Sequence, residues 1–99
     1  MYQIPLFDLN YGKEEEQAVL ETLRSKWISM GPKCVELEKR FAEMLGVEYA
    51  CAVTNCTAAL HLACCVLGIK EGDEVICPSL TFAATVNCIR YVGAVPVFA

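Results

Sequence analysis

From residue 48 onward the sequence alternates between strand-like and helix-like runs, and this alternation constrains the fold more than any other feature. Strand-like runs occupy residues 48–54 (EYACAVT), 74–78 (EVICP) and 94–99 (AVPVFA). Helix-like runs occupy residues 57–68 (TAALHLACCVLG) and 81–93 (TFAATVNCIRYVG), and each ends in glycine. Because each helix-like run is long enough to connect parallel strands, the order β-α-β-α-β predicts an α/β layered sheet.

The first half of the chain has a helical pattern instead. Residues 4–12 (IPLFDLNYG) are expected to form an extended arm, because Pro5 and Gly12 interrupt regular structure. A first helix is predicted from Lys13 to about Lys26, with apolar residues at three- and four-residue intervals at Val19, Leu20, Leu23 and Trp27. A second helix is expected to begin at Pro32 and to end at Gly46, with an apolar stripe of Leu37, Phe41, Met44 and Leu45.

The chain is short and apolar. Its 99 residues make one small domain at most, yet 56% of them are hydrophobic and the mean hydropathy is +0.41. The final apolar run at 95–99 would leave an open edge on a parallel sheet, and such sheets are normally covered on both faces. We therefore expect the N-terminal part of a larger α/β protein that pairs with other chains.

A membrane span is the rival explanation for this apolar character. Residues 49–69 contain no Asp, Glu, Lys or Arg, and a spanning helix needs ~20 residues. However, polar side chains are costly in the middle of a span, and Thr54, Asn55, Thr57 and His61 fall there. The pattern also changes from strand-like to helix-like inside the stretch, so we expect no membrane association.

Charge and cysteine spacing exclude several other classes. The net charge of −4 leaves no basic stripe for nucleic acid. The seven cysteines form no C-x-x-C pair and the chain has one histidine, so neither a zinc site nor a disulfide framework is expected. Met1 is not followed by a basic segment and an apolar block, as in a signal peptide. A reduced, cytoplasmic protein without a metal site is the expectation.

The junction at residues 53–61 (VTNCTAALH) is the first candidate site. A strand that runs directly into a helix leaves the first helical N–H groups unpaired, and the helix dipole makes them attractive to a phosphate. In a parallel sheet this junction lies at the carboxyl ends of the strands, where ligands bind in open α/β folds. The alternative is a plain N-cap, in which Thr54, Asn55 or Thr57 only satisfies helix donors.

A second candidate segment follows the next predicted strand. The sequence CPSLTF places Ser79, Thr81 and Phe82 just beyond Cys77. Adjacent parallel strands would bring this loop to the same edge of the sheet, where the Phe82 ring could face a flat cofactor. The alternative for Phe82 is ordinary core packing.

Several motifs resemble one family along essentially the whole chain. The segments TNCTAALHLA, GDEVICPSLTF and GAVPVF, with IPLFDL, GP and FAEMLGV before them, resemble the pyridoxal-phosphate sugar aminotransferases of the DegT/DnrJ/EryC1/StrS type. The resemblance implies a fold-type-I aminotransferase, with residues 1–46 as an arm and two helices. Residues 47–99 would then start the cofactor-binding sheet of the large three-layer domain.

The resemblance also implies a half-site for pyridoxal 5′-phosphate. It assigns Cys56, Thr57 and Ala58 to the cofactor phosphate, through the N–H groups of Thr57 and Ala58 and the Thr57 hydroxyl, and it places the Phe82 ring on the pyridine. Ser79 and Thr81 would be neighbours of the site, and Gly31 with Pro32 a turn near its entrance. Where many relatives have glycine this chain has Cys56, and we expect some backbone strain there.

The resemblance implies that the family's Schiff-base lysine, and the aspartate that pairs with the pyridinium nitrogen, come well after the last residue of this sequence. The five lysines present lie in predicted helices or in a turn, so none takes that role. No catalytic residue is therefore assigned. The intact enzyme would transfer an amino group, commonly from glutamate, to a nucleotide-linked keto sugar, and would act as a homodimer. The alternatives are a regulatory partner of full-length subunits and a dehydratase relative.

Overall fold

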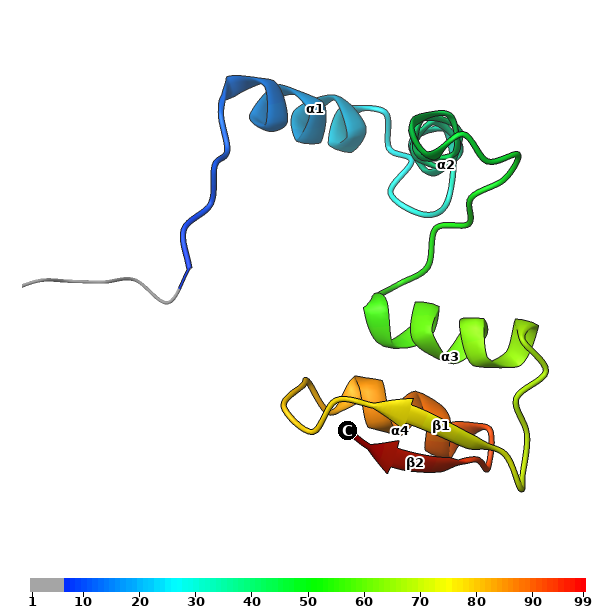
Figure 1. Cartoon of the computed structure of the whole chain (residues 1–99). Coiled ribbons are helices and arrows are strands. Elements are labelled where there is room, and N and C mark those ends of the chain that lie inside the picture. Colours follow the sequence, from blue (N-terminus) through cyan, green and yellow to red (C-terminus); the bar gives the residue numbers. More distant parts are fainter. Residues whose placement is uncertain (1–6) are drawn as a thin grey trace, which may run out of the picture. The chain divides into compact units, whose positions relative to one another are not determined.

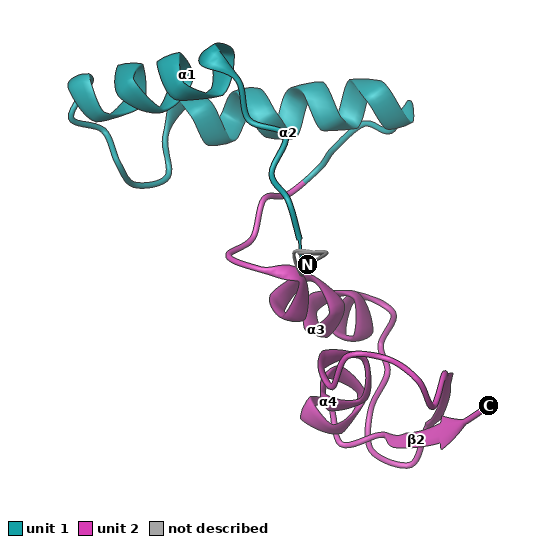
Figure 2. Cartoon of the chain, turned by 90° about the vertical axis from the view of Figure 1, so that its left-hand side faces the viewer, with its two compact units in different colours: residues 1–50 teal, residues 51–99 magenta. Residues whose placement is uncertain are grey.

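The computed structural model describes residues 7–99, which form two compact units: unit 1 reaches to residue 50, and unit 2 comprises residues 51–99 (Figure 2). The beginning of the predicted N-terminal arm, including Pro5, lies outside the described residues. Residues 7–12 have no regular secondary structure, in agreement with the rest of that prediction.

Unit 1 contains two helices whose ends match the sequence signals. Helix α1 spans Lys13–Arg24, and the Glu15 carboxylate accepts a hydrogen bond of 2.7 Å from the Gly12 N–H at its start. Helix α2 spans Pro32–Leu45 and has proline in its first turn. It ends at Gly46, whose φ of 68° is the left-handed conformation that closes many helices. Both predicted helices are confirmed, although Trp27 lies beyond α1 instead of on its apolar face.

Unit 2 contains the order α3-β1-α4-β2 (Figure 1). Helix α3 spans Cys56–Val66, strand β1 Glu74–Cys77, helix α4 Ala84–Tyr91 and strand β2 Val95–Phe98. The two strands are parallel, with Glu74 opposite Val95 and Cys77 opposite Phe98, and α4 is the crossover between them. The predicted α/β class is thus confirmed.

The predicted strand at residues 48–54 is wrong. This segment has no regular secondary structure, and Cys51 and Val53 are exposed. A strand requires a neighbour for its backbone N–H and C=O groups, and the described sheet contains β1 and β2 alone. Helix α4 also begins three residues later than predicted, because the loop after β1 runs on to Ala83.

The core of unit 2 is built from small side chains. Ile89, which is 2% exposed, lies in one cluster with four smaller buried residues, Cys64, Cys77, Cys88 and Ala94. Helix α4 contacts both strands and packs on α3. No disulfide joins any of the seven cysteines, and those in the core act as small apolar groups. None of the helices in residues 7–99 is both long and apolar enough to cross a bilayer.

Candidate functional site

One end of unit 2 gathers the segments singled out in the sequence. Figure 1 shows that α3 and α4 begin at the end toward which β1 and β2 point. The junction before α3 and the loop between β1 and α4 therefore both lie at the carboxyl-terminal end of the strands. Ligands of open α/β sheets bind at this kind of edge.

Asn55 is the residue that caps α3. Its backbone is extended, with φ of −167° and ψ of 169°, and its Oδ1 accepts a hydrogen bond of 2.9 Å from the Ala58 N–H. The Asn55 carbonyl accepts a second bond of 3.2 Å from the Ala59 N–H. Of the three capping candidates in the sequence, Asn55 thus takes this role and Thr54 and Thr57 do not.

The cap leaves two backbone donors at the start of α3 without a partner among the described residues. These are the N–H groups of Cys56 and Thr57, and the Thr57 hydroxyl likewise makes no hydrogen bond there. Aligned N–H groups at a helix start, with the positive end of its dipole, suit a phosphate. The Ala58 N–H, which the resemblance assigns to the phosphate, donates to Asn55 Oδ1 in this structure.

Cys56 lies in the first turn of α3 without backbone strain. Among the described residues, Lys26 is the one non-glycine position with positive φ. The backbone at Cys56 therefore does not need glycine's left-handed conformation, and the strain expected from a close approach of phosphate stays a prediction. The Cys56 side chain is exposed and forms no disulfide.

The loop after β1 presents an aromatic ring. Phe82 is 80% exposed, so core packing does not explain it, and its carbonyl accepts a bond of 3.0 Å from the Thr85 N–H. Thr81 and Thr85 share a hydroxyl hydrogen bond of 2.9 Å, which ties the loop to the first turn of α4. The Ser79 N–H donates to the Ala99 carbonyl at 3.3 Å. The ring is therefore available to a flat partner, on a loop that is anchored at both sides.

His61 and the core thiols belong to the packing of unit 2. The rings of His61 and Tyr91 meet edge to face, with centroids 5.3 Å apart. Burial raises the pKa of the Cys64 thiol, and the adjacent Cys88 thiol adds to the effect. A buried, protonated thiol is a poor nucleophile, so Cys64 has no catalytic role.

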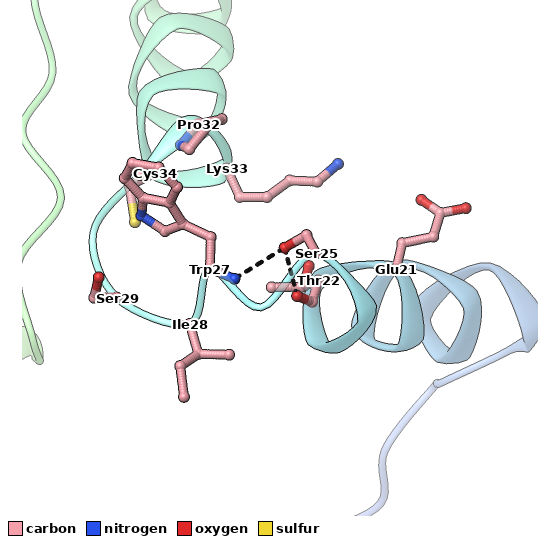
Figure 3. A pocket seen from close by; sticks show the side chains of 10 residues that line it. Glu21, Thr22, Ser25, Trp27, Ile28, Ser29, Pro32, Lys33 and Cys34 are labelled. Carbon is pink, nitrogen blue, oxygen red and sulfur yellow. Dashed lines mark hydrogen bonds between the residues drawn. The ribbon is translucent and has the colours of Figure 1, made fainter.

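Sequence reasoning missed a pocket in unit 1 between the end of α1 and the start of α2 (Figure 3). Its volume is about 570 Å³, and Trp27, Ser29, Gly31 and Lys33 are among the residues that line it. The four-residue spacing between Leu23 and Trp27 predicted that Trp27 lies on α1, although the helix ends at Arg24. The sequence does carry a signal, since Gly31 and Pro32 follow the aromatic residue closely.

A comparison with protein families matches residues 10–99 to the DegT/DnrJ/EryC1/StrS aminotransferase family. The chain is 53% identical over 98 residues to the spore coat polysaccharide biosynthesis protein SpsC of Bacillus subtilis. This match covers 99% of the present chain and 24% of SpsC. It is 48% identical to the GDP-perosamine synthase of Escherichia coli O157:H7, of which it covers 27%. The chain thus spans about a quarter of the length of these relatives.

Solved structures agree with these relatives. Spr1654 from Streptococcus pneumoniae, described as a sugar aminotransferase and solved in its PLP form, superposes with a TM-score of 0.89 at 40% identity. The match covers 99% of this chain and 25% of that one. A GDP-4-keto-6-deoxymannose-3-dehydratase with a trapped PLP-glutamate geminal diamine gives a TM-score of 0.88 at 27% identity, over 98% of this chain and 27% of that one.

Proposed function

The chain belongs to the DegT/DnrJ/EryC1/StrS aminotransferase family, and from this we propose that it forms the phosphate-binding half of a pyridoxal 5′-phosphate site. The observation that supports this proposal is the start of α3, where two backbone N–H groups and the Thr57 hydroxyl have no partner among the described residues. In the longer protein, pyridoxal phosphate supplies an electron sink for amino transfer. The residues described here bind and orient that group.

Each residue of the half-site has a separate task. The N–H groups of Cys56 and Thr57 donate to phosphate oxygens, and the Thr57 hydroxyl adds a third donor. The exposed Phe82 ring covers one face of the pyridine, by the offset stacking that aromatic rings favour. Ala58 contributes its N–H when Asn55 releases it, and Ser79 and Thr81 support the loop that carries the ring.

We assign no catalytic residue to this chain. Lys13, Lys33 and Lys39 lie in the helices of unit 1, and Lys26 lies in the turn after α1. Lys70 precedes β1, so it lies at the amino end of the strand, opposite the end that carries the half-site. The covalent attachment of the cofactor and the transfer chemistry therefore belong to the longer protein.

The substrate and setting of that protein follow from its relatives. We propose that it transfers an amino group, with glutamate as donor, to a keto sugar carried on a nucleotide, in the synthesis of an amino sugar or a polysaccharide. One relative is a GDP-perosamine synthase and another acts in spore coat polysaccharide biosynthesis. We further propose a cytoplasmic homodimer without nucleic-acid or membrane partners, consistent with a net charge of −4.

A dehydratase is the second candidate function, because one solved neighbour is a GDP-4-keto-6-deoxymannose-3-dehydratase. A regulatory partner of full-length subunits is the third. Both would use the same half-site at the start of α3. The longer protein distinguishes the first two by its product, which is an amino sugar from a transferase and a deoxy keto sugar from a dehydratase.

The half-site is tested with the chain alone and two probes that differ by one phosphate. Adding pyridoxal 5′-phosphate should shift the amide NMR signals of Cys56 and Thr57, whereas pyridoxal should not. Thr57→Val should weaken the response, and the matched change Thr54→Val should not. Equal shifts with both probes would contradict phosphate recognition. Borohydride treatment should label no single lysine in full stoichiometric yield.

A further inference from the structure

Two buried thiols in the core of unit 2 lie where two helices meet. Cys64 belongs to the second half of α3 and is 7% exposed, and Cys88 belongs to α4 and is 4% exposed. Both are members of the same cluster of buried residues, and α3 packs on α4 (Figure 2). The cofactor half-site at the start of α3 uses neither thiol.

Hydrogen bonds connect the two thiols with each other and with the backbone. Burial raises the pKa of the Cys64 thiol, and its hydrogen bond with the Cys88 thiol raises that pKa further. The Cys88 thiol donates to the Thr85 carbonyl, with 3.2 Å between Sγ and the oxygen. Because the Cys88 hydrogen is used at Thr85, the Cys64 thiol is the donor of the pair. The two sulfur atoms are therefore neighbours in the reduced chain.

The other nearby cysteines are not equivalent partners. Cys77 lies at the end of β1 in the same cluster, but among the described residues the thiols that act on Cys64 are those of Cys88 and Cys65. Cys65 is exposed, and consecutive side chains on a helix do not face each other. Cys88 is thus the one cysteine that is both buried with Cys64 and in contact with it.

The chemistry open to this pair is oxidation. A structural zinc site takes four ligands, and within residues 7–99 no group of three or more His, Cys, Asp or Glu side chains is arranged to hold a metal ion. A disulfide instead needs two cysteines whose side chains point toward each other on backbones that lie close together. Helices approach more closely where the side chains at their contact are small, as Cys64 and Cys88 are.

We propose that Cys64 and Cys88 form a reversible disulfide that joins α3 to α4 when the chain meets a small-molecule disulfide such as oxidised glutathione. One cysteine thiolate attacks the S–S bond of glutathione and expels a glutathione thiolate, which takes up a proton. The other cysteine thiolate then attacks the mixed disulfide and expels the second glutathione. Two protein thiols are thereby oxidised to one disulfide, while one glutathione disulfide is reduced to two thiols.

The bond would act on the stability of unit 2. It would enclose residues 65–87, which include β1, and a disulfide stabilises a fold chiefly by restricting the unfolded chain. Buried thiols exchange slowly, and disulfides in a reducing compartment are transient, so the bond would respond to sustained oxidation. This inference concerns the helix contact and does not depend on cofactor binding.

Mass spectrometry of the whole 99-residue chain tests the bond. A short treatment with iodoacetamide first blocks the exposed thiols, and oxidised glutathione is then added to the folded chain. The chain is next unfolded in N-ethylmaleimide, which labels every thiol that is still free. Trypsin cleaves after Lys70 and therefore separates Cys64 from Cys88. The expected product is a disulfide-linked pair of peptides, residues 41–70 with residues 71–90.

The labels identify which cysteines are linked. In the expected product Cys65 carries the iodoacetamide label and Cys77 carries N-ethylmaleimide, which leaves Cys64 and Cys88 as the linked residues. A link through Cys65 or Cys77 would overturn the proposal. Recovery of both Cys64 and Cys88 with N-ethylmaleimide would overturn it as well.

Variants and thermal unfolding test the effect of the bond. Cys88→Ala should abolish the linked peptides, whereas the matched core change Cys77→Ala should retain them; should Cys88→Ala not fold, the labels in the unaltered chain decide. The blocked chain should melt at a higher temperature after oxidation than before it, and dithiothreitol should reverse the increase. Linked peptides without an increase in melting temperature would refute the stabilisation of unit 2.

Discussion

Replacing Asn55 by alanine is the sharpest test of how α3 begins. The substitution removes the Oδ1 acceptor that holds the Ala58 N–H at 2.9 Å. It leaves the Ala59 N–H bond to the backbone carbonyl of residue 55 intact. Asn55→Ser is the matched control, because serine caps helices about as well as asparagine.

The expected loss of stability follows from this single bond. Exchanging an asparagine cap for alanine costs about 0.5–2 kcal/mol, typically about 1 kcal/mol. For a domain of about 60–100 residues, 1 kcal/mol lowers the melting temperature by about 4–8 °C. Thermal unfolding followed by far-UV circular dichroism should show this decrease for Asn55→Ala and little change for Asn55→Ser. If all three proteins melt at the same temperature, the cap does not stabilise α3.

Asn55→Ala should strengthen ligand binding, although it lowers the stability of the fold. With the side-chain acceptor gone, the Ala58 N–H becomes available to a phosphate. A net hydrogen bond is worth about 0.5–1.5 kcal/mol, so the affinity for pyridoxal 5′-phosphate should increase by up to about tenfold. Asn55→Ser retains a cap and should gain less. Weaker binding in Asn55→Ala would show that the Asn55 side chain itself contacts the phosphate, and would refute the competition.

Four further predictions concern packing and protonation. Ile89→Ala should lower the free energy of unfolding in urea by about 2–5 kcal/mol, because Ile89 is 2% exposed. Ile76 is 75% exposed, so Ile76→Ala should lower it by less than about 0.5 kcal/mol. Equal losses would contradict the assignment of Ile89 to the core. Cys64 should alkylate more slowly than its exposed neighbour Cys65. Burial raises the pKa of the Cys64 thiol, so the folding stability should be full below the ordinary thiol pKa and should fall as pH rises through the raised value. Unfolding measured against pH should show this fall in the unaltered chain and not in Cys64→Ala. The hydrogen bond from the Gly12 N–H lowers the pKa of Glu15. The stabilisation of α1 by this bond should therefore be present above the ordinary carboxyl pKa and should be lost as pH falls through the lowered pKa. An NMR titration that shows no lowered pKa for Glu15 would contradict the hydrogen bond.

Proline and glycine in the sequence predicted most of the helix and strand boundaries. These residues begin or end an element through the conformation of their own backbone, without a partner elsewhere in the chain. Pro32 suits the first turn of α2, and Gly46 closes that helix in the left-handed conformation. The strand predicted at 48–54 failed for the opposite reason. Its apolar residues favour an extended chain, but a strand also depends on a partner elsewhere, and no described segment pairs with it.

The candidate sites also divide into features that local sequence predicts and features that depend on how the chain folds. The end of β1 at Cys77 predicted where Phe82 lies, whereas the strand predicted before Thr57 is absent and Thr57 is positioned by the start of α3. The sequence did not identify which polar side chain would cap α3, because Asn55 and its threonine neighbours are all competent caps. The pocket at Trp27 was missed because the contact of its ring with Gly31 depends on how the turn folds.

The two-stranded sheet has a consequence for the chain in concentrated solution. Strands β1 and β2 pair with each other, so within the described residues each has one edge whose backbone groups face no other strand. Both strands also carry exposed apolar side chains, Ile76 in β1 and Phe98 in β2 among them. An unpaired strand edge is a template for strands of other molecules. We therefore expect the purified chain to self-associate through its sheet as concentration rises, and a lysine at Ile76 to keep it dispersed.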